Sequence, residues 1–414
     1  MDCRNVPIKE IGKVVTGKTP LTSHQEYYDG EYMFITPNEL HGEYLVSSSE
    51  KTITKAGIES IKSNRISGTS ILVGCIGWDM GNVAVCEEDC ATNQQINSVT
   101  QIKSEYNPLY LYYWLRGKKE YLFSIASVTR TPILSKSVFE EVLVPMPNKD
   151  IQDHISEMLS AIDKKIVNNN RINDNLQQQL KLLYDYWFTQ FDFPDEKGMP
   201  YKSSGGLMVA KDKISYDIPA DWTVGNLFDN PLTTVIKPGV DIFDKKSYLA
   251  TAEVNGTDIS IGTLIEYETR ESRANMQPTV NSVWFAKMKN SIKHLYLNKE
   301  MDELVNNSIL STGFCGLQCS EDTFEYVASF IEHSYFETLK DTLAHGATQE
   351  AVNNDDLTGV SFVIPSERVL HLFHERTQSI YSQISKNICE NQELTQLRDW
   401  LLPMLMNGQA VVQN

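Results

Sequence analysis

The chain has 414 residues, which is enough for two or three domains of ordinary size. Its composition, 41% hydrophobic and 22% charged, is typical of a globular protein and excludes wholesale disorder. The net charge of −17 excludes a simple nucleic-acid-coating protein, which would carry a basic domain, but it leaves room for DNA binding through local basic loops.

The sequence carries no pattern typical of export or membrane insertion. Its start, "MDCRNVPIKEIGK", lacks the charged-then-apolar order of a signal peptide. The longest apolar runs, such as "SILVGCIGW", are much shorter than the ~20 residues of a membrane helix. Seven scattered cysteines fit a reducing compartment better than a disulfide framework. We therefore expect a cytoplasmic protein that binds no membrane.

Residues 1–148 form the first expected domain. Short apolar runs broken by turn residues, among them "EYMFITPNEL", "SILVGCIGW" and "VLVPMP", predict strands. The stretch "PLYLYYWLRGKKEYLFSIA" predicts the clearest helix. Together these segments indicate an α/β unit that is rich in irregular loops.

Residues 149–192 predict one long helix. Apolar residues such as Ile155, Leu159 and Ile162 recur along one helical face at spacings of three, four and seven. Asparagines at 168–170 and 173 interrupt this face, and an asparagine at a seam position favours one helix register over others. At 1.5 Å per residue, ~40 residues make a helix about 60 Å long.

The rest of the chain repeats this order. We expect a linker at 193–216, a second α/β domain at 217–366, a second long helix at 367–408 and a tail at 409–414. At a shift of 218 residues "VLVPMP" matches "VSFVIP" and the two helix stripes coincide, with a slip of one residue near their ends. The upstream segments "SILVGCIGWDMGNVAV" and "VPIKEI" match "SVWFAKMKNSIKHLYL" and "WTVGNL" at shifts of 212 and 216.

This repeat predicts the fold class. Two long helices with matching seams can pair as a coiled coil. Each helix follows one globular unit, so an antiparallel pair would have approximate twofold symmetry. We predict an α/β protein with two α/β domains joined by two long helices, which form an antiparallel coiled coil with an internal pseudo-twofold repeat. The alternative is that each helix packs only on its own domain.

Several motifs together carry a family resemblance that covers essentially the whole chain. In the first half these are "TGKTP", "EYYDGEYMFITPNEL", "GNVAVCEEDCATNQQINSV", "VTRTPILSKSVFEEVLVPMP" and "IVNNNRINDNLQQQLKLLYDYWFTQFDFP". The second half adds "GMPYKSSGGLMV", "DIPADWTVGNL", "SRANMQ", "VWFAKM", "STGFCGL" and "GATQEAVNNDDL". In this order and spacing the chain resembles the specificity subunit of a Type I restriction-modification system.

The resemblance implies a non-catalytic, sequence-specific DNA-binding subunit. Its two target-recognition domains would each read one half of a split sequence in double-stranded DNA, and its paired helices would set their separation. The implied partners are two methyltransferase subunits and the restriction/translocase subunits, so the chain takes part in adenine methylation and phage defence. It would bind no cofactor itself, whereas S-adenosylmethionine, ATP and Mg²⁺ would be used by the partners.

The sequence offers weaker signals for catalysis or metal binding. "YNPLY" at 106–110 is reminiscent of an amino-methyltransferase motif, but Leu109 replaces a proline, and we expect Asn107 and Pro108 simply to begin a helix. Neither a strand–loop–helix nucleotide cradle nor a Walker-type loop is visible. Two Cys-x-x-x-Cys pairs, at 86 and 90 and at 315 and 319, are expected to be buried thiols rather than zinc ligands.

The candidate DNA contacts are loop residues whose side chains can reach base edges or phosphates. Amides can pair bidentately with adenine and arginine with guanine, and lysines neutralise phosphates. The first domain offers Lys18, Thr19, Asn38, Trp78, Asp79, Asn93, Gln94, Gln95 and Arg130. The second domain offers Arg273, Asn275, Lys287, Lys289, Lys293, His345, Thr348 and Gln349.

Three other functions stay open. The chain could serve a related defence system with a different effector, or be a structural coiled-coil adaptor with two ligand-binding modules and no DNA role. A methyltransferase is the third alternative. "ATNQQ" and "GATQ", which we expect at comparable places in the two domains, favour DNA readout over the adaptor. Outer polar faces of the helices are expected to dock partners, and Trp187, Phe188 and Trp400 to pack the helix ends on a domain or to cap the rod.

Overall fold

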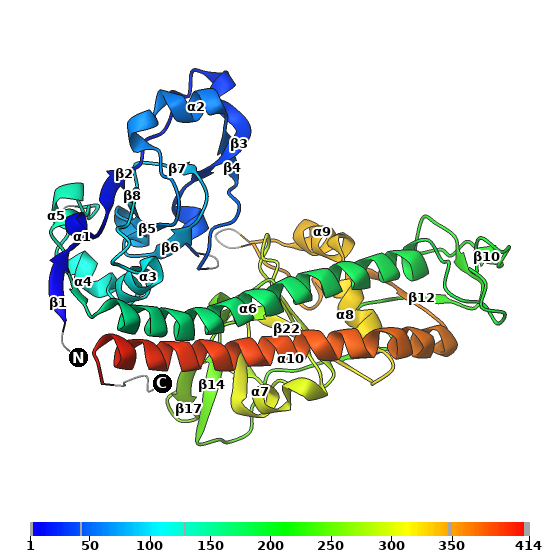
Figure 1. The fold of residues 1–414 in the computed structure, drawn as a ribbon. Coiled ribbons are helices and arrows are strands. Elements are labelled where there is room, and N and C mark those ends of the chain that lie inside the picture. Colours follow the sequence, from blue (N-terminus) through cyan, green and yellow to red (C-terminus); the bar gives the residue numbers. More distant parts are fainter. Residues whose placement is uncertain (1–2, 42–43, 128–129, 347–349, 410–414) are drawn as a thin grey trace. The chain divides into compact units, whose positions relative to one another are not determined.

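Each of the two long helices contributes one half to each of two compact units. In the computed structural model, which describes residues 3–41, 44–127, 130–346 and 350–409, the first unit comprises residues 1–167 and 394–414 (Figure 1). The second comprises residues 168–393. The helices are α6 (Lys149–Tyr184), which continues into a π-helical turn (Asp185–Thr189), and α10 (Glu367–Met406).

The first unit is built on two small sheets. One has the strand order β2-β8-β5-β6 and is antiparallel throughout, whereas the other has the order β4-β3-β7 with β3 and β7 parallel. A separate strand pair, β1-β9, leads into α6. The strands are β1 (Arg4–Pro7), β2 (Lys13–Thr16), β3 (Tyr28–Ile35), β4 (Lys51–Ile53), β5 (Ser70–Gly74), β6 (Val83–Cys86), β7 (Cys90–Thr92), β8 (Ile96–Thr100) and β9 (Leu143–Met146).

Short helices close the core of the first unit. Helix α3 carries the apolar run predicted from the sequence, and Tyr110, Leu111 and Leu115 on it are fully buried where it packs against β5 and β6. The side chain of Asn107 accepts hydrogen bonds from the backbone of Leu109 and Tyr110, which confirms that it caps this helix. The helices are α1 (Ile8–Ile11), α2 (Lys55–Ser60), α3 (Pro108–Arg116), α4 (Lys119–Ser124) and α5 (Lys136–Glu140).

The second unit repeats this scheme. It has sheets of order β13-β22-β19-β20 and β17-β14-β21-β18, in which β14 and β21 are parallel, and a pair β12-β23 that leads into α10. Its helices are α7 (Asp302–Asn307), α8 (Phe324–Glu332) and α9 (Ser334–Leu343). Its strands are β10 (Met208–Val209), β11 (Ile218–Pro219), β12 (Thr223–Asn226), β13 (Thr233–Val235), β14 (Lys245–Leu249), β15 (Val254–Asn255), β16 (Asp258–Ile259), β17 (Thr263–Glu266), β18 (Ala274–Met276), β19 (Ser282–Ala286), β20 (His294–Leu297), β21 (Ser308–Ser311), β22 (Phe314–Cys319) and β23 (Ser361–Ile364).

Strand pairing sets the correspondence between the units. Ile71 lies opposite Val99 in the first unit, and Val283 lies opposite Leu317 in the second, which confirms the shift of 212 for the β5 segment. The predicted shift of 216 for "VPIKEI" is wrong. The backbone of Ile8 donates to Val142 as that of Leu227 donates to Val360, so the matching positions differ by 219.

The two long helices pack together and run antiparallel. In the second unit Asn387 donates to Asn173 at 2.8 Å, and Asn169 donates to Asn391 at 2.9 Å. The paired residue numbers rise on one helix as they fall on the other, which is the antiparallel order. In the first unit, Leu402 and Leu405 of α10 join the same core cluster as Ile155 and Leu159 of α6. Each helix therefore does more than pack on its own domain.

The predicted slip of one residue near the helix ends is not present. The burial pattern keeps the shift of 218, because Tyr184 and Leu402 are both buried and Leu182 and Trp400 are both exposed. Trp187 and Phe188 pack in the core of the second unit beside Phe373, as predicted for the aromatic helix end. The same prediction is wrong for Trp400, which is 60% exposed.

Candidate nucleic-acid interface

Loops at one edge of the first unit bring most of its candidate residues together. The backbone N–H of Lys18, just after β2, donates to the carbonyl of Thr92 at the end of β7 at 2.8 Å. The hydroxyl of Thr19 donates to Oε1 of Gln94 at 3.0 Å. Residues 18–19 and the β7–β8 turn thus form one surface, on which Lys18 and Gln94 are exposed.

Two amides of this surface hold the turn itself. Nδ2 of Asn93 donates to Oε1 of Gln95 at 3.0 Å, and the backbone N–H of Gln95 donates to Oδ1 of Asn93 at 3.0 Å. The backbone of Asn93 also donates to Ile35 at the end of β3, directly before the short helix that carries Asn38. Asn93 and Gln95 therefore shape the turn, while Gln94 and Asn38 are the exposed amides beside it.

The loop between β5 and β6 carries Trp78 and Asp79. The N–H of Cys75 donates to the carbonyl of Gln95 at 2.8 Å, so this loop starts beside the β7–β8 turn. Asp79 accepts from His41 across a 2.6 Å contact, which ties the loop to the segment that follows Asn38. Trp78 has no such anchor among the described contacts and its side chain is 91% exposed.

Arg130 reaches the same edge from the segment before α5. The N–H of Gly77 donates to Pro132 at 3.0 Å, and the N–H of Leu134 donates to Cys75 at 2.9 Å. The exposed Arg130 therefore lies two residues from the β5–β6 loop contact. We call this edge the first rim and define it as residues 18–19, 38–41, 77–82, 93–95 and 130–132.

The second unit builds an equivalent rim with the same backbone hydrogen bonds. Lys287 N–H donates to Gly313 at 2.9 Å, as Cys75 donates to Gln95. Lys289 N–H donates to Glu350 at 3.0 Å, and Val352 N–H donates to Lys287 at 3.0 Å. These two bonds match the bonds from Gly77 to Pro132 and from Leu134 to Cys75. The shift is 212 for the residues of the β5–β6 loop and 218 for the residues of the later segment. The second rim is residues 237–239, 273–275, 287–293, 311–313, 345–346 and 350–352.

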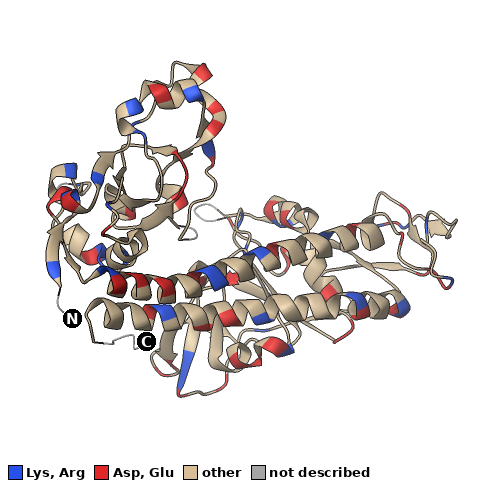
Figure 2. Cartoon of the chain, in the orientation of Figure 1, with Lys and Arg blue, Asp and Glu red and all other residues tan. Residues whose placement is uncertain are grey.

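The lysines of the second rim are partly engaged. Nζ of Lys289 pairs with Oε2 of Glu350 at 2.7 Å, and Nζ of Lys293 donates to the carbonyl of Thr251. Lys287 is half-buried. The segment 287–293 nevertheless contains three lysines and no acidic residue, so it is a local basic loop on an acidic chain. Figure 2 shows basic and acidic residues interleaved along both long helices.

The remaining candidates of the second unit are placed less uniformly. Arg273 is exposed, and its carbonyl accepts from the N–H of Thr312 in the β21–β22 turn at 2.8 Å. Asn275 is half-buried in β18. Nδ1 of His345 lies 3.4 Å from Oδ2 of Asp356. Thr348 and Gln349 lie outside the described residues.

The expected correspondence between "ATNQQ" and "GATQ" is wrong. The β7–β8 turn that contains Asn93 and Gln95 corresponds to residues 311–313, because Gln95 and Gly313 accept equivalent hydrogen bonds. His345 corresponds instead to Ser127. The N–H of His345 donates to the carbonyl of Ala351, and in the same way the N–H of Ser127 donates to the carbonyl of Ile133. The similarity of letters paired two loops that have different places in the repeat.

Sequence reasoning also missed residues of both rims. Lys237, exposed just after β13, corresponds roughly to the loop that carries Lys18, and Thr312 corresponds to Gln94. In the first unit Lys119 donates to Asn82 on the β5–β6 loop at 2.7 Å. The signal that could have found Thr312 is the shift of 218, applied from β8 rather than from the surrounding letters.

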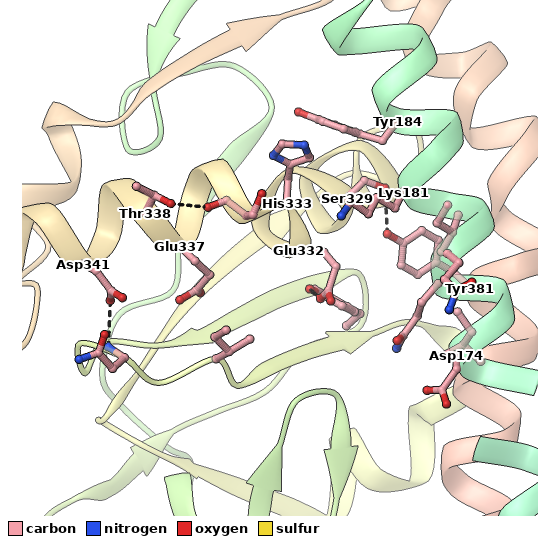
Figure 3. Close-up of a pocket in the computed structure, with 18 residues that line it drawn as sticks. Asp174, Lys181, Tyr184, Ser329, Glu332, His333, Glu337, Thr338, Asp341 and Tyr381 are labelled. Carbon is pink, nitrogen blue, oxygen red and sulfur yellow. Dashed lines mark hydrogen bonds between the residues drawn. The ribbon is translucent and has the colours of Figure 1, made fainter. Parts of the chain in front are cut away.

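A cavity of about 780 Å³ in the second unit lies between α6, α8, α9 and the β19–β20 hairpin (Figure 3). Several of its polar groups form hydrogen bonds within the fold. Ser329 bonds the hydroxyl of Tyr381 at 2.9 Å, and Asp341 accepts from the N–H of Asn290 at 3.0 Å. Glu332 and Glu337 both contact the buried His294 behind the cavity wall. These side chains therefore hold α8, α9 and α10 and the β19–β20 hairpin together, and we do not assign the cavity as the functional site.

The cysteine pairs are buried thiols in the described structure. Sγ of Cys86 lies 3.5 Å from Sγ of Cys90, and burial raises the pKa of Cys315 to about 12. Within residues 3–41, 44–127, 130–346 and 350–409, His, Cys, Asp and Glu side chains form no group of three that could hold a metal ion. In the same ranges no helix has the length and apolar character needed to cross a membrane.

Known proteins share this sequence and fold. A sequence model of the family described as Type I restriction modification DNA specificity domain matches residues 2–178. The Type I restriction enzyme MjaIX specificity subunit of Methanocaldococcus jannaschii is 26% identical to this chain, over 98% of this chain and 93% of the relative. The first domain thus matches the family model, and the whole chain is similar to a Type I restriction-modification specificity subunit. This similarity indicates a specificity subunit that recognises a DNA target and leaves catalysis to other subunits.

Two further comparisons agree with this family. The HindI specificity subunit of Haemophilus influenzae is 28% identical over 42% of this chain and 39% of its own length. The crystal structure of the Type I system S subunit from M. genitalium is similar in fold, with a TM-score of 0.54 and 13% identity over 98% of this chain and 96% of that chain. That structural likeness supports the arrangement of two β-rich domains and two packed long helices.

Proposed function

We propose that each rim of this specificity subunit reads one half of a bipartite DNA sequence. The observation that carries the proposal is the repeated set of backbone hydrogen bonds that holds both rims, with Cys75 and Lys287 in matching places. The same scaffold presents different side chains in the two units. Two rims with one architecture and different chemistry are suited to two different half-sites on one duplex.

The exposed side chains divide by the type of DNA contact they can make. The exposed Lys18 in the first rim and the partly exposed lysines at 287–293 in the second are suited to phosphates, which position the protein without reading sequence. Arg130 and Arg273 can bond the O6 and N7 atoms of guanine, and Gln94 can bond the N6 and N7 atoms of adenine. Asn93 and Gln95 act through the turn they hold, because their amides already bond each other.

The paired helices would serve as the ruler between the half-sites. Half-sites on one face of a duplex are read together only when their separation is fixed. Buried asparagines that bond across the helix pair, such as Asn173 and Asn387, favour one register of the antiparallel helices. A fixed register makes the spacer in the DNA target a constant length.

Two copies of one partner are the assembly that the repeat favours. Leu182 on α6 and Trp400 on α10 correspond at the shift of 218, and they are 69% and 60% exposed. Exposed large apolar side chains at matching positions are suited to one protein surface that binds twice. We assign this partner as the methyltransferase subunit, which would use S-adenosylmethionine. Restriction/translocase subunits, which would use ATP and Mg²⁺, complete the proposed complex.

The experiment that tests the proposal is genome-wide mapping of methylated adenines in cells with and without this chain. The expected result is loss of one bipartite motif, with two short half-sites around a fixed spacer, when the chain is deleted. Reintroduced Arg130→Ala should relax only one half-site and Arg273→Ala only the other, by about 1–3 kcal/mol of discrimination each. Lys197→Ala, on the exposed loop of the linker, is the matched control and should restore the native motif.

Different outcomes separate the alternatives. A motif that disappears on deletion but changes in both halves with either arginine variant would contradict the assignment of one half-site per rim. An unchanged methylation pattern, in cells where the partner subunits are expressed, would favour the coiled-coil adaptor without a DNA role. A purified complex that binds no duplex DNA would give the same conclusion in solution.

A further inference from the structure

Trp78 is the most exposed large apolar side chain in the part of the chain that the structure describes. It occupies the tip of the β5–β6 loop, where a 3-10 turn spans Gly77–Asp79. The loop is closed by hydrogen bonds in both directions between residues 74 and 81–82, and Met80 is fully buried beneath it. Gly77 has a φ of +68°, a conformation that glycine adopts without strain. The indole is therefore presented by a firmly held loop.

The surroundings of this indole are those of the proposed DNA surface. Its loop bonds the β7–β8 turn through Cys75 and the Arg130 segment through Gly77. The ammonium group of Lys119 lies on the same loop, 2.7 Å from Oδ1 of Asn82. The acidic neighbour Asp79 is paired with His41. Cationic and amide side chains thus gather around an apolar surface that has no covering within the unit.

The repeat shows that the indole is not part of the common scaffold. At the shift of 212 the position of Trp78 is taken by Asn290, whose N–H is bonded by Asp341 at 3.0 Å. Both loops keep the equivalent hydrogen bonds to the segments that follow α4 and α9. The second loop is held with an asparagine at this position, which takes the positive φ (+55°) that Gly77 takes in the first loop, so a loop in this place does not need tryptophan for folding. The side chain is therefore available for a contact that only the first rim makes.

We propose that Trp78 stacks its indole ring on a base of the first half-site, at a step that is unstacked in the complex, and that the second rim makes no such contact. This inference rests on the proposed DNA-reading function and adds a deformation of the duplex to it. An indole offers one N–H donor and no acceptor, so it reads base edges poorly. Its flat aromatic face is instead matched by the face of a base.

The stacking contact would make the first half-site sensitive to DNA deformability. Unstacking a step costs free energy that depends on the step, and pyrimidine–purine steps are the easiest to open. The first rim would therefore select a flexible step at a position where it makes no base-edge hydrogen bond. The second rim, with Asn290 in the matching place, would select by hydrogen bonds and phosphate contacts alone.

Tryptophan fluorescence tests the contact directly. The chain has six tryptophans, and four of them, Trp114, Trp187, Trp222 and Trp284, are buried. The Trp400→Phe variant therefore leaves Trp78 as the single exposed indole. This variant, in complex with the methyltransferase subunits, is titrated with the duplex identified by methylation mapping. Stacking on a base should quench the Trp78 emission, whereas the double variant with Trp78→Phe should lose that change.

Affinity gives the second readout. Trp78→Ala should weaken binding of the target duplex by about 5- to 150-fold, and Trp78→Phe, which keeps a stacking ring, should recover most of that loss. Leu207→Ala, at an exposed apolar position of the linker, is the matched control and should leave duplex affinity unchanged. Because Trp78 is almost fully exposed, these substitutions should not alter the fold, which circular dichroism checks.

Each outcome decides between named alternatives. Quenching by DNA together with the affinity loss supports the stacking contact. A blue-shifted, brighter Trp78 emission that appears on adding the partner subunits without DNA would overturn it and make Trp78 a protein contact. Unchanged affinity in Trp78→Ala, with a native methylation motif for the wild type, would also overturn it. If the wild type itself yields no motif, the proposed function fails first.

Discussion

Nη1 of Arg398 on α10 donates to Oδ1 of Asp163 on α6 at 2.8 Å, and both side chains are buried. Oδ2 of the same carboxylate accepts from the hydroxyl of Tyr113 on α3 at 2.7 Å. One buried aspartate thus joins both long helices to the first recognition domain. In the second unit the matching positions are Tyr381 and Ser329, which bond each other at 2.9 Å. The side-chain hydrogen bond between a long helix and a domain helix is therefore present in both units, but different residue types form it.

We predict that Arg398→Met destabilises the first unit by about 3 kcal/mol, because removing one member of a buried ion pair leaves the other charge without compensation. The measurement is the midpoint and slope of urea unfolding. Asp399→Asn is the matched control, since Asp399 also bonds Arg398, at 2.9 Å, but is half exposed. Equal losses for the two variants would show that the buried partner has no special role.

Substitution of the asparagines between the two long helices should affect both the stability and the register of the helix pair. Asn387→Ala leaves the buried amide of Asn173 without its partner and should cost about 1–3 kcal/mol. The double variant with leucine at both positions should recover this stability, because apolar side chains fill the seam. It should also loosen the register of the helices. Methylation mapping would then detect motifs with more than one spacer length, whereas a single spacer would argue against the ruler.

The internal repeat made much of the fold predictable from sequence. Long apolar stripes gave the two helices, and the match of β5 to β19 at 212 residues followed from their apolar letters. The predictions that failed concern segments whose similar sequences do not occupy equivalent positions in the structure. "QLK" and "QLR" invited a slip of one residue, yet the buried positions Leu180 and Arg398 keep the shift of 218. Leu180 and Arg398 can occupy equivalent buried positions in the repeat because Asp163 neutralises the charge of the arginine.

The candidate site was less predictable for a physical reason. The first-rim residues come from five loops, and only backbone pairing between β2, β3, β5, β7 and β8 brings Lys18 near Gln94. Loop residues face few packing constraints, so their letters do not reveal their neighbours. In the second unit this allowed "GATQ" to be matched with the wrong loop, and Lys237 and Thr312 were missed. Chemistry alone suggested polar and cationic loop residues, but it could not show that Asn93 and Gln95 bond each other.

The buried His294 predicts a dependence of stability on pH. Burial lowers its pKa, but hydrogen bonds from its ring to Glu332 and Glu337, each at 2.9 Å, raise the pKa more, so the net shift is upward from 6.5. Its contribution to stability is therefore full below pH 6.5 and is lost as the pH rises through the folded-state pKa. His294→Gln should remove this decline in the free energy of unfolding.

The cluster of His294, Glu332, Glu337 and Lys340 also makes stability depend on pH at low pH. Burial raises the pKa of Glu337, but hydrogen bonds and charges from His294 and Lys340 lower it more, so the net shift is downward from 4.5. Its contribution is full above pH 4.5 and is lost as the pH falls through the folded-state pKa. The cluster should thus stabilise most between pH 4.5 and 6.5, measured by urea unfolding across pH. His345→Gln, at an exposed position, should leave the profile unchanged.

Lys18 and Gln94 should affect DNA binding in different ways, although they lie side by side on the first rim. If the first rim contacts DNA as proposed, Lys18→Ala removes one phosphate contact and should weaken binding of target and unrelated duplexes by the same factor. The slope of log affinity against log salt should become shallower by about 0.9. Gln94→Ala should weaken only the target duplex and leave the salt slope unchanged, because it removes a base contact.

The measurement is fluorescence anisotropy of labelled duplexes between about 50 and 200 mM salt, the range over which phosphate contacts are resolved. The assembled complex is used, since the proposed partner subunits would share the duplex. Lys13 lies at the start of β2, the end of the strand away from the rim, and is exposed, so Lys13→Ala is the matched control. If Lys13→Ala lowers the salt slope as much as Lys18→Ala, the effect reflects net charge and the rim is not the DNA surface. If only Lys18→Ala lowers it, a single charged position at the mouth of the β7–β8 turn faces the phosphates.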